Sequence, residues 1–269
     1  MKRVELFEFE DFNWLPNVVR RSITNLIIIF HKIMGTKEVL AILLSKIRDS
    51  HHFEQIVDLG SGSGGPMPEV VEELNKGIDK PVSLVLSDLH PNQKIVEAVN
   101  NHKHPYLRYH ENAINAVDMV NAPQGLKTMI ASFHHMNPSV AKKILQSAEK
   151  NNLPILIYEV AKNNIPLLVW LLFLPISLTI LVLMSLVMTF WVRPLTLSQV
   201  LFTYIIPIIP MVYAWDGQAS LMRTYTFDDI KQLLGDTDST HYTWTIEDAT
   251  KANGKKLGYY ISGVPNNAV

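Results

Sequence analysis

A short strand that breaks into a glycine-rich turn and then a helix is the feature that most constrains the fold of this chain. Residues 55–57 are an apolar run typical of a buried strand, and residues 67–74 have the pattern of a helix. The turn that follows the strand reads Asp58-Leu59-Gly60-Ser61-Gly62-Ser63-Gly64. Glycine permits positive φ and lets backbone N–H groups approach a ligand closely. The sequence therefore predicts a ligand site where this strand ends.

Two acidic residues indicate which ligand the turn binds. Gly60, Gly62 and Gly65 also satisfy the dinucleotide fingerprint, so glycine spacing alone leaves a nicotinamide dinucleotide open. Asp58 favours a ligand with positive charge, because pyrophosphate is already anionic. Asp88 follows a second apolar run, where an acid is placed to accept hydrogen bonds from ribose hydroxyls. A turn without a ligand is the remaining alternative, and it leaves the placement of both acids unexplained.

At these residues the chain resembles the class I S-adenosylmethionine-dependent methyltransferases. Residues 58–64 look like the first motif of that family, and Asp88 looks like its ribose-binding acid. The resemblance covers residues 35–160 and resumes after residue 215. It implies a Rossmann-like, doubly wound α/β fold with a mainly parallel, seven-stranded sheet. It also implies S-adenosylmethionine as cofactor, bound by Asp58, Gly60, Ser61, Gly62, Gly64 and Asp88, with the adenine near Asn112 and Ala113.

The remaining patterns agree with such a sheet. Strands that alternate with helices predict a mainly parallel sheet with helices on both faces. Helices are expected at residues 18–34, 39–47 and 138–150 and from residue 226, and strands at residues 82–86, 128–133, 154–158, 242–246 and 258–263.

A long apolar segment interrupts this alternation. Between Lys162 and Asp216 the one charged residue is Arg193. As a helix, residues 165–192 would be about 42 Å long, enough to cross a hydrocarbon core of about 30 Å. A buried helical hairpin in a soluble oligomer is the alternative, but an uncharged run of this length is more typical of membrane insertion.

A second apolar run, residues 200–215, predicts that the segment is a hairpin. Pro207 and Pro210 interrupt this run and would leave carbonyl groups unpaired in lipid unless protein or water covers them. Because one folded domain cannot straddle a bilayer, the segment must leave and return on the same side. Whether it spans the bilayer or only enters it stays open. Interfacial aromatic residues are expected at Trp191, Tyr213 and Trp215.

Composition excludes several classes of protein. The 269 residues have a net charge of -1 and no basic run, so we expect no nucleic-acid partner. The absence of cysteine excludes disulfides, thiolate zinc sites and cysteine nucleophiles.

We expect a membrane location with the catalytic domain on the cytoplasmic face. The expected parts are N-terminal helices over the cofactor site (1–50), a methyltransferase core (51–162), the membrane hairpin (163–215) and the remainder of the core (216–269).

The candidate catalytic residues stand where ligands bind in such sheets, beyond the carboxyl ends of the strands. His134 and His135 follow the strand expected at 128–133, and Glu159 follows the next strand. Strand alternation would send the two histidines to opposite sides. Histidine suits the removal of a proton from a hydroxyl or amine acceptor, and a hydrogen-bonded structural role is the alternative. No third ligand stands at short spacing, so we expect no metal.

Residues after the apolar segment extend the resemblance. Residues 133–136 and 215–226 are similar to those of predicted bacterial methyltransferases that carry a hydrophobic insert at the same point. Asp216 and Arg223 are expected to pair with each other, and the alternative is that Arg223 binds a phosphate or carboxylate headgroup. Lys162, Arg193 and the aromatic residues are the expected membrane anchors.

The place of the insert predicts the substrate class. It leaves from the sheet edge where cofactor and acceptor must meet, so we expect a methyltransferase at the membrane with a lipid or other lipophilic small molecule as acceptor. One alternative is a membrane-bound S-adenosylmethionine-binding regulatory or scaffold protein without catalysis. Another is a soluble homodimeric methyltransferase of small molecules that uses the hairpin as its interface.

Overall fold

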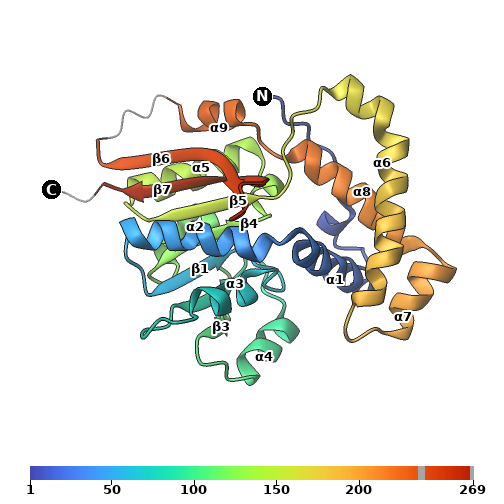
Figure 1. Ribbon diagram of the computed structural model, residues 1–269, viewed down its shortest axis with the longest axis horizontal. Helices are drawn as coiled ribbons and strands as arrows, with labels where there is room; N and C mark the ends of the chain where they lie inside the picture. The colour runs from blue at the N-terminus through green and yellow to red at the C-terminus, as the bar shows by residue number, and fades with distance from the viewer. Residues whose placement is uncertain (236–239, 267–269) are drawn as a thin grey trace. The chain divides into compact units, whose positions relative to one another are not determined.

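Seven strands form one mixed sheet in the part of the chain that the computed structural model describes, residues 1–235 and 240–266 (Figure 1). Their order across the sheet is β3-β2-β1-β4-β5-β7-β6. The strands are β1 (Gln55–Leu59), β2 (Ser83–Ser87), β3 (Leu107–Tyr109), β4 (Leu126–Ile130), β5 (Ile155–Glu159), β6 (Tyr242–Thr250) and β7 (Lys256–Pro265). The predicted Rossmann-like, mainly parallel α/β sheet is confirmed.

Strands β1 to β5 are parallel, whereas β7 is antiparallel to both β5 and β6. Parallel strands are covered on both faces and are therefore apolar along most of their length. Accordingly, every residue of β5 is buried. Figure 1 shows α2 in front of the strands and α5 behind them. The covering helices are α2 (Thr36–Ser50), α3 (Met67–Leu74), α4 (Gln93–Asn101), η2 (Ala116–Asn121), α5 (Pro138–Lys150) and α9 (Phe227–Leu234).

The sheet departs from the predicted elements in two places. Helix α4 and strand β3 have no counterpart among them, because β3 is a short strand at the sheet edge and α4 buries a single residue, Val96. Strand β4 ends at Ile130, before the predicted end at residue 133. Ala131 has a φ of 51°, which turns the chain out of the sheet and into the 3-10 helix η3 (Phe133–His135).

The internal contacts divide the chain into two units. The sheet unit consists of Gly35–Val160 and Phe227–Val269. The helical unit consists of Met1–Met34 and Ala161–Thr226. The N-terminal helix and the apolar segment therefore share one unit, although the predicted boundaries place them in separate parts of the chain.

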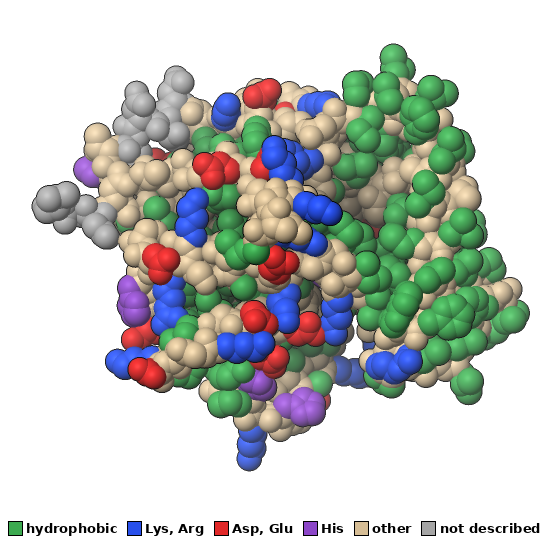
Figure 2. All heavy atoms as spheres, in the orientation of Figure 1, with side chains coloured by type: hydrophobic (Ala, Val, Ile, Leu, Met, Phe, Trp, Pro, Cys, Tyr) green, Lys and Arg blue, Asp and Glu red, His purple; other side chains and the backbone are tan. Residues whose placement is uncertain are grey.

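The apolar segment folds into two arms within the helical unit. The first arm is α6 (Leu167–Met188), continued by η4 (Thr189–Trp191). The second arm consists of α7 (Leu197–Val200), the π-helix η5 (Leu201–Ile205) and α8 (Ile208–Arg223), with a bend of 77° between η5 and α8. The bend lies at Pro207, which has no N–H to continue the helix. Helix α6 packs along α8, and apolar side chains cover its outer surface (Figure 2).

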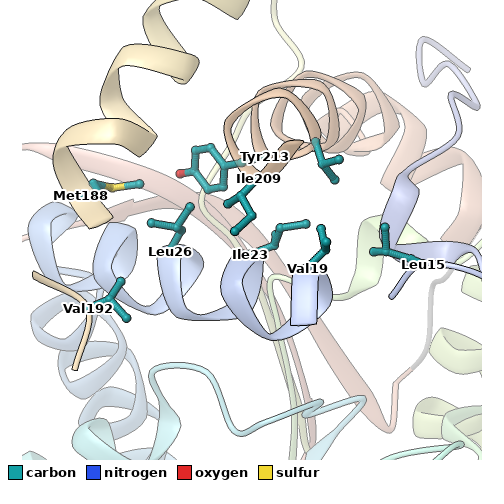
Figure 3. Packing of buried hydrophobic residues seen from close by; sticks show 9 residues of the cluster. Leu15, Val19, Ile23, Leu26, Met188, Val192, Ile209 and Tyr213 are labelled. Atoms are coloured by element: carbon teal, nitrogen blue, oxygen red, sulfur yellow. The ribbon is translucent and has the colours of Figure 1, made fainter. Parts of the chain in front are cut away.

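Helix α1 (Asn17–Met34) supplies the core of the helical unit. Its buried residues recur every three or four positions, so they form one helical face. The buried cluster contains Leu15, Val19, Ile23, Leu26, Met188, Val192, Ile209, Val212 and Tyr213 (Figure 3). Tyr213 is only 7% exposed, so the expectation that it is an interfacial aromatic is wrong: it faces α1. Trp191 is 55% exposed, as an interfacial residue should be.

The N-terminal segment is bound to the end of α8. Asp216 accepts hydrogen bonds from the backbone N–H groups of Phe9 (2.7 Å) and Glu10 (3.2 Å). Arg223 pairs through Nη1 with Glu8 (3.1 Å) and with Asp11 (2.6 Å). These contacts stand in place of the expected Asp216–Arg223 pair. The sequence did not predict these contacts, because the N-terminal segment lies more than two hundred positions before Asp216 and Arg223.

Two glycines near the start of β7 give a test of this fold. Gly258 has a φ of 72°, and a Cβ there would lie 2.1 Å from the carbonyl oxygen of Glu159. Gly254 has a φ of 80° but open space around it. We expect Gly254→Ala to lower the free energy of unfolding by about 1–2 kcal/mol, the cost of the left-handed conformation. Gly258→Ala adds a clash of about 1–3 kcal/mol. Chemical denaturation measures both, and equal losses would contradict the close approach of β7 to β5.

Candidate functional site

The glycine loop between β1 and α3 is built on positive φ angles. Gly60, Gly62, Gly64 and Gly65 have φ values of 68°, 56°, 99° and 49°. Ser61 fastens the loop to both strands: its N–H donates to Ser87 O (2.9 Å) and its hydroxyl donates to Asp58 O (2.7 Å). The loop is therefore held rigidly where β1 and β2 end.

The loop leaves room and unused hydrogen-bonding groups for a ligand. An added Cβ at Gly62 or Gly65 would meet nothing within 4 Å, whereas at Gly64 it would lie 3.0 Å from a methyl carbon of Leu86. Among the described residues, the buried hydroxyl oxygens of Ser63 and Ser132 have no hydrogen-bond partner. Buried polar atoms are nearly always paired, so unpaired ones beside an open loop indicate a place for a polar ligand.

Asp88 follows β2 directly and is aimed at the loop. Its Oδ2 accepts from the backbone N–H of Gly62 (3.0 Å), and its Oδ1 accepts from the N–H of His90 (2.8 Å). Each carboxylate oxygen can accept more than one hydrogen bond, so capacity remains for the hydroxyls of a sugar. The carbonyl of Asp88 accepts from the N–H of Ile114 (2.8 Å), which draws the loop after β3 to the same strand end. Asn112 and Ala113 lie exposed in that loop.

Asp58 lies below the loop and is 3% exposed. Its Oδ1 accepts from the hydroxyl of Thr128 on β4 (2.6 Å). Burial raises the pKa of Asp58 to about 7, because the charged form loses its hydration. A carboxyl group in this state ionises readily once a positive charge arrives nearby.

Tyr109 is a residue of this site that the sequence did not predict. Its hydroxyl donates to Gly62 O (2.9 Å), which fixes the loop from the side of β3. Burial and the nearby Asp88 raise the pKa of Tyr109, so it stays a neutral donor. Because β3 was not recognised as a strand, nothing in the sequence placed Tyr109 at the sheet edge.

His134 and Glu159 form a buried pair at the ends of β4 and β5. The Nδ1 atom of His134 lies 2.9 Å from Glu159 Oε2, and the backbone N–H of His134 donates to Glu159 Oε1 (2.9 Å). The two side chains are 7% and 3% exposed. With Nδ1–H donated to the carboxylate, the basic lone pair of the imidazole is on Nε2. The pair has the geometry of a general base whose tautomer is fixed by an acid.

The expected alternation of the two histidines is wrong. Both lie in η3 rather than in a strand, because Ala131 ends β4 early. Their ring centroids are 4.3 Å apart with planes tilted by 35°, so the rings lie against each other. His135 is more exposed than His134. The structure thus brings both histidines and Glu159 together and gives the close carboxylate contact to His134.

Comparison with known proteins identifies the fold. No protein-family model matches the sequence, and no curated protein matches it. The solved structure of the plantazolicin methyltransferase BpumL in complex with a monoazolic desmethylPZN analog and SAH matches with a TM-score of 0.51 at 10% identity. The complex of BpumL with SAH matches with a TM-score of 0.50 at 9% identity. Both matches cover 93% of this chain and 98% of the other. The chain thus has the fold of class I S-adenosylmethionine-dependent methyltransferases, as its residues predicted.

The pKa of Asp58 generates a test on the ligand-free protein. Its folded-state pKa of about 7 lies above the unfolded value, so the folded state binds the proton more tightly. This group therefore costs stability as pH rises from about 4 to about 7, by up to about 4 kcal/mol. Asp58→Asn keeps an oxygen for Thr128 and removes the titration. We expect the variant to be the more stable of the two at pH 8 and nearly equal at pH 4.

Urea denaturation at several pH values measures this difference. Glu10 also has a raised pKa of about 7, but it is present in both proteins and cancels in the comparison. If the difference in free energy of unfolding between the two proteins did not change with pH, the pKa of Asp58 would not be raised in the folded state.

Proposed function

We propose that this chain is an S-adenosylmethionine-dependent methyltransferase that works at a membrane on a lipophilic acceptor. The single observation that carries the proposal is the glycine loop on this fold: there is open space beside Gly62 and Gly65, and Asp88 accepts a hydrogen bond from the N–H of Gly62. The BpumL structures with the same fold contain SAH, which supports the same cofactor here. Asp58, Gly60, Ser61, Gly62, Gly64 and Asp88 would hold it, with Asn112 and Ala113 in the adjoining loop.

Each binding residue has a distinct part in this proposal. Asp88 would accept hydrogen bonds from ribose hydroxyls, while Ser63 and Ser132 contribute hydroxyls that have no partner in the described chain. Asp58 would supply negative charge beneath the loop. When bound, S-adenosylmethionine supplies a methyl group on a positively charged sulfur. The protein then has to place an acceptor atom in line with that methyl, which is the main contribution that positioning can make.

His134 is the base that we propose for the acceptor. Glu159 accepts a hydrogen bond from the Nδ1–H group of His134. Its negative charge stabilises the imidazolium that forms when Nε2 takes a proton from a hydroxyl or amine. Because Glu159 also accepts the backbone N–H of His134, it fixes both the ring and the main chain of its partner. His135 would line the acceptor side next to His134 rather than take the proton.

The helical unit supports the membrane part of the proposal. The most apolar 18-residue window of the helix Leu167–Trp191 has a mean hydropathy of 2.7, and only 6% of the residues in that window are buried, so most of its apolar side chains are at least partly exposed. Within the described residues it is the one helix long and apolar enough to cross a bilayer. An exposed apolar surface of this extent needs an apolar partner. A membrane partner in turn favours an acceptor that reaches the enzyme from the lipid phase.

Cofactor binding is the first measurement. Titration calorimetry of the purified protein with SAH should show binding, and Asp88→Asn should weaken it by roughly 10- to 100-fold, the worth of one or two charge-assisted hydrogen bonds. Asp79→Asn, at an exposed loop position, is the matched control and should bind like the parent protein. Binding of a nicotinamide dinucleotide in place of SAH would show that the loop serves another cofactor.

Methyl transfer is the second measurement. The protein is incubated with S-adenosylmethionine carrying a labelled methyl and a total lipid extract, and we expect label in the organic phase. His134→Ala should lower the rate by about 10²–10⁴-fold without weakening SAH binding, and Glu159→Gln should lower it less. His135→Ala is the neighbouring control and should lose the least. SAH binding without label in any extract would favour the scaffold alternative, and a larger loss in His135→Ala would reassign the base.

A further inference from the structure

The outer surface of the helical unit is apolar along the full length of the first arm. Leu168 and Leu172 near the start of α6 are 81% and 73% exposed, and Phe190 beyond its end is 63% exposed. Figure 2 shows apolar side chains gathered along α6 and around α7. Further exposed members of this surface are Leu171, Phe173, Ile176, Ile180, Leu183 and Val187. The outer surface of α6 is therefore apolar from its first turn to its last, and the exposed charge beyond it is Arg193 in the turn.

Helix α1 fixes where the far end of α6 can lie. Met188 and Val192, at that end, belong to the buried cluster with Leu26 of α1, and Figure 3 shows Met188 next to Leu26. Asn25 adds a hydrogen bond from Nδ2 to Gln199 Oε1 (3.4 Å), beyond the turn. The far end of the hairpin is thus packed on the second half of α1 within one unit.

Helix α1 is joined to the sheet unit by a single residue. It ends at Met34, Gly35 follows, and α2 begins at Thr36. At about 1.5 Å per residue, Leu26 lies about 12 Å from the end of α1, and two packed helices are about 10 Å apart. The far end of α6 therefore lies within roughly 20 Å of the end of α1, less than the hydrocarbon core of about 30 Å.

Charged residues surround Gly35, the junction between α1 and α2, and favour its exposure to water. Lys32 in the last turn of α1 and Lys37 and Glu38 in the first turn of α2 are exposed. Burial of such charges in lipid is costly, so the junction lies outside the hydrocarbon. The near end of α6 follows β5 after a short connection, residues 160–166. Both ends of the hairpin are thus tied to the side of the membrane that holds the sheet unit.

We propose that the insert is monotopic: α6 and α7 enter the leaflet that faces the sheet unit and return without crossing the bilayer. The occupant of the apolar surface is the acyl layer of that one leaflet. Helix α1 lies at headgroup level, with Arg21 and Lys32 exposed toward lipid phosphates and with Trp14 (66% exposed) and Trp191 at the interface. This inference rests on the proposed membrane function and defines which part of the membrane the protein contacts.

The sidedness of single thiols tests the inference. The chain has no cysteine, so Arg193→Cys in the hairpin turn and Lys143→Cys on α5 of the sheet unit each introduce one thiol. Both positions are exposed. Each variant is expressed in bacteria, and a membrane-impermeant maleimide is applied to intact cells, to inverted membrane vesicles and to detergent-solubilised membranes. Lys143→Cys reports the side of the sheet unit.

We expect Arg193→Cys to react in the same preparation as Lys143→Cys, or to react only after detergent is added. In either case it should not react in the preparation that exposes the opposite side of the membrane. Reaction in the opposite preparation would show a transmembrane hairpin and overturn the inference. Recovery of both variants in the soluble fraction after carbonate extraction would also overturn it, and would favour a second copy of the chain as the partner. Methyl transfer is assayed separately, so labelled lipid together with opposite-side reaction would leave the proposed function standing.

Discussion

The whole candidate site depends on how the glycine loop is fastened to the two central strands. Ser61 joins the ends of β1 and β2 through its N–H and hydroxyl, and Tyr109 holds Gly62 from β3. These bonds fix four positive φ angles that other residues adopt only with strain. Because the loop is set before any ligand binds, little ordering is left for binding to do. The neighbouring acids can therefore act on a nearly rigid frame.

Local patterns predicted the elements that carry strong signals. The glycine loop, α3, α5 and the central strands follow from apolar runs bounded by turn residues, and Asp88 follows from its place after β2. The His134–Glu159 contact did not follow, because it depends on the register of β4 against β5 and on the left-handed Ala131. Tyr109 was missed for a similar reason: a three-residue edge strand has no periodicity to detect.

The apolar segment shows a related limit. Its length and lack of charge predicted membrane contact, and the structure leaves that surface exposed. Sequence alone could not show that α1 belongs to the same unit, since its apolar face suits the sheet equally well. Nor could it show that Glu8 and Asp11 pair with Arg223. The hydrogen bonds from the backbone N–H groups of Phe9 and Glu10 to Asp216 were equally hidden from sequence analysis. Tertiary partners from opposite ends of the chain decided the arrangement of this unit.

If the chain binds S-adenosylmethionine as proposed, the buried carboxyl of Asp58 would couple cofactor binding to proton exchange. Near neutral pH the empty site holds part of a proton, because burial raises the pKa of Asp58 to about 7. A cationic ligand favours the ionised form, so its arrival would release that fraction to the buffer. Heats of association would then vary with the ionisation enthalpy of the chosen buffer. Affinity would strengthen as the medium becomes more alkaline across this range.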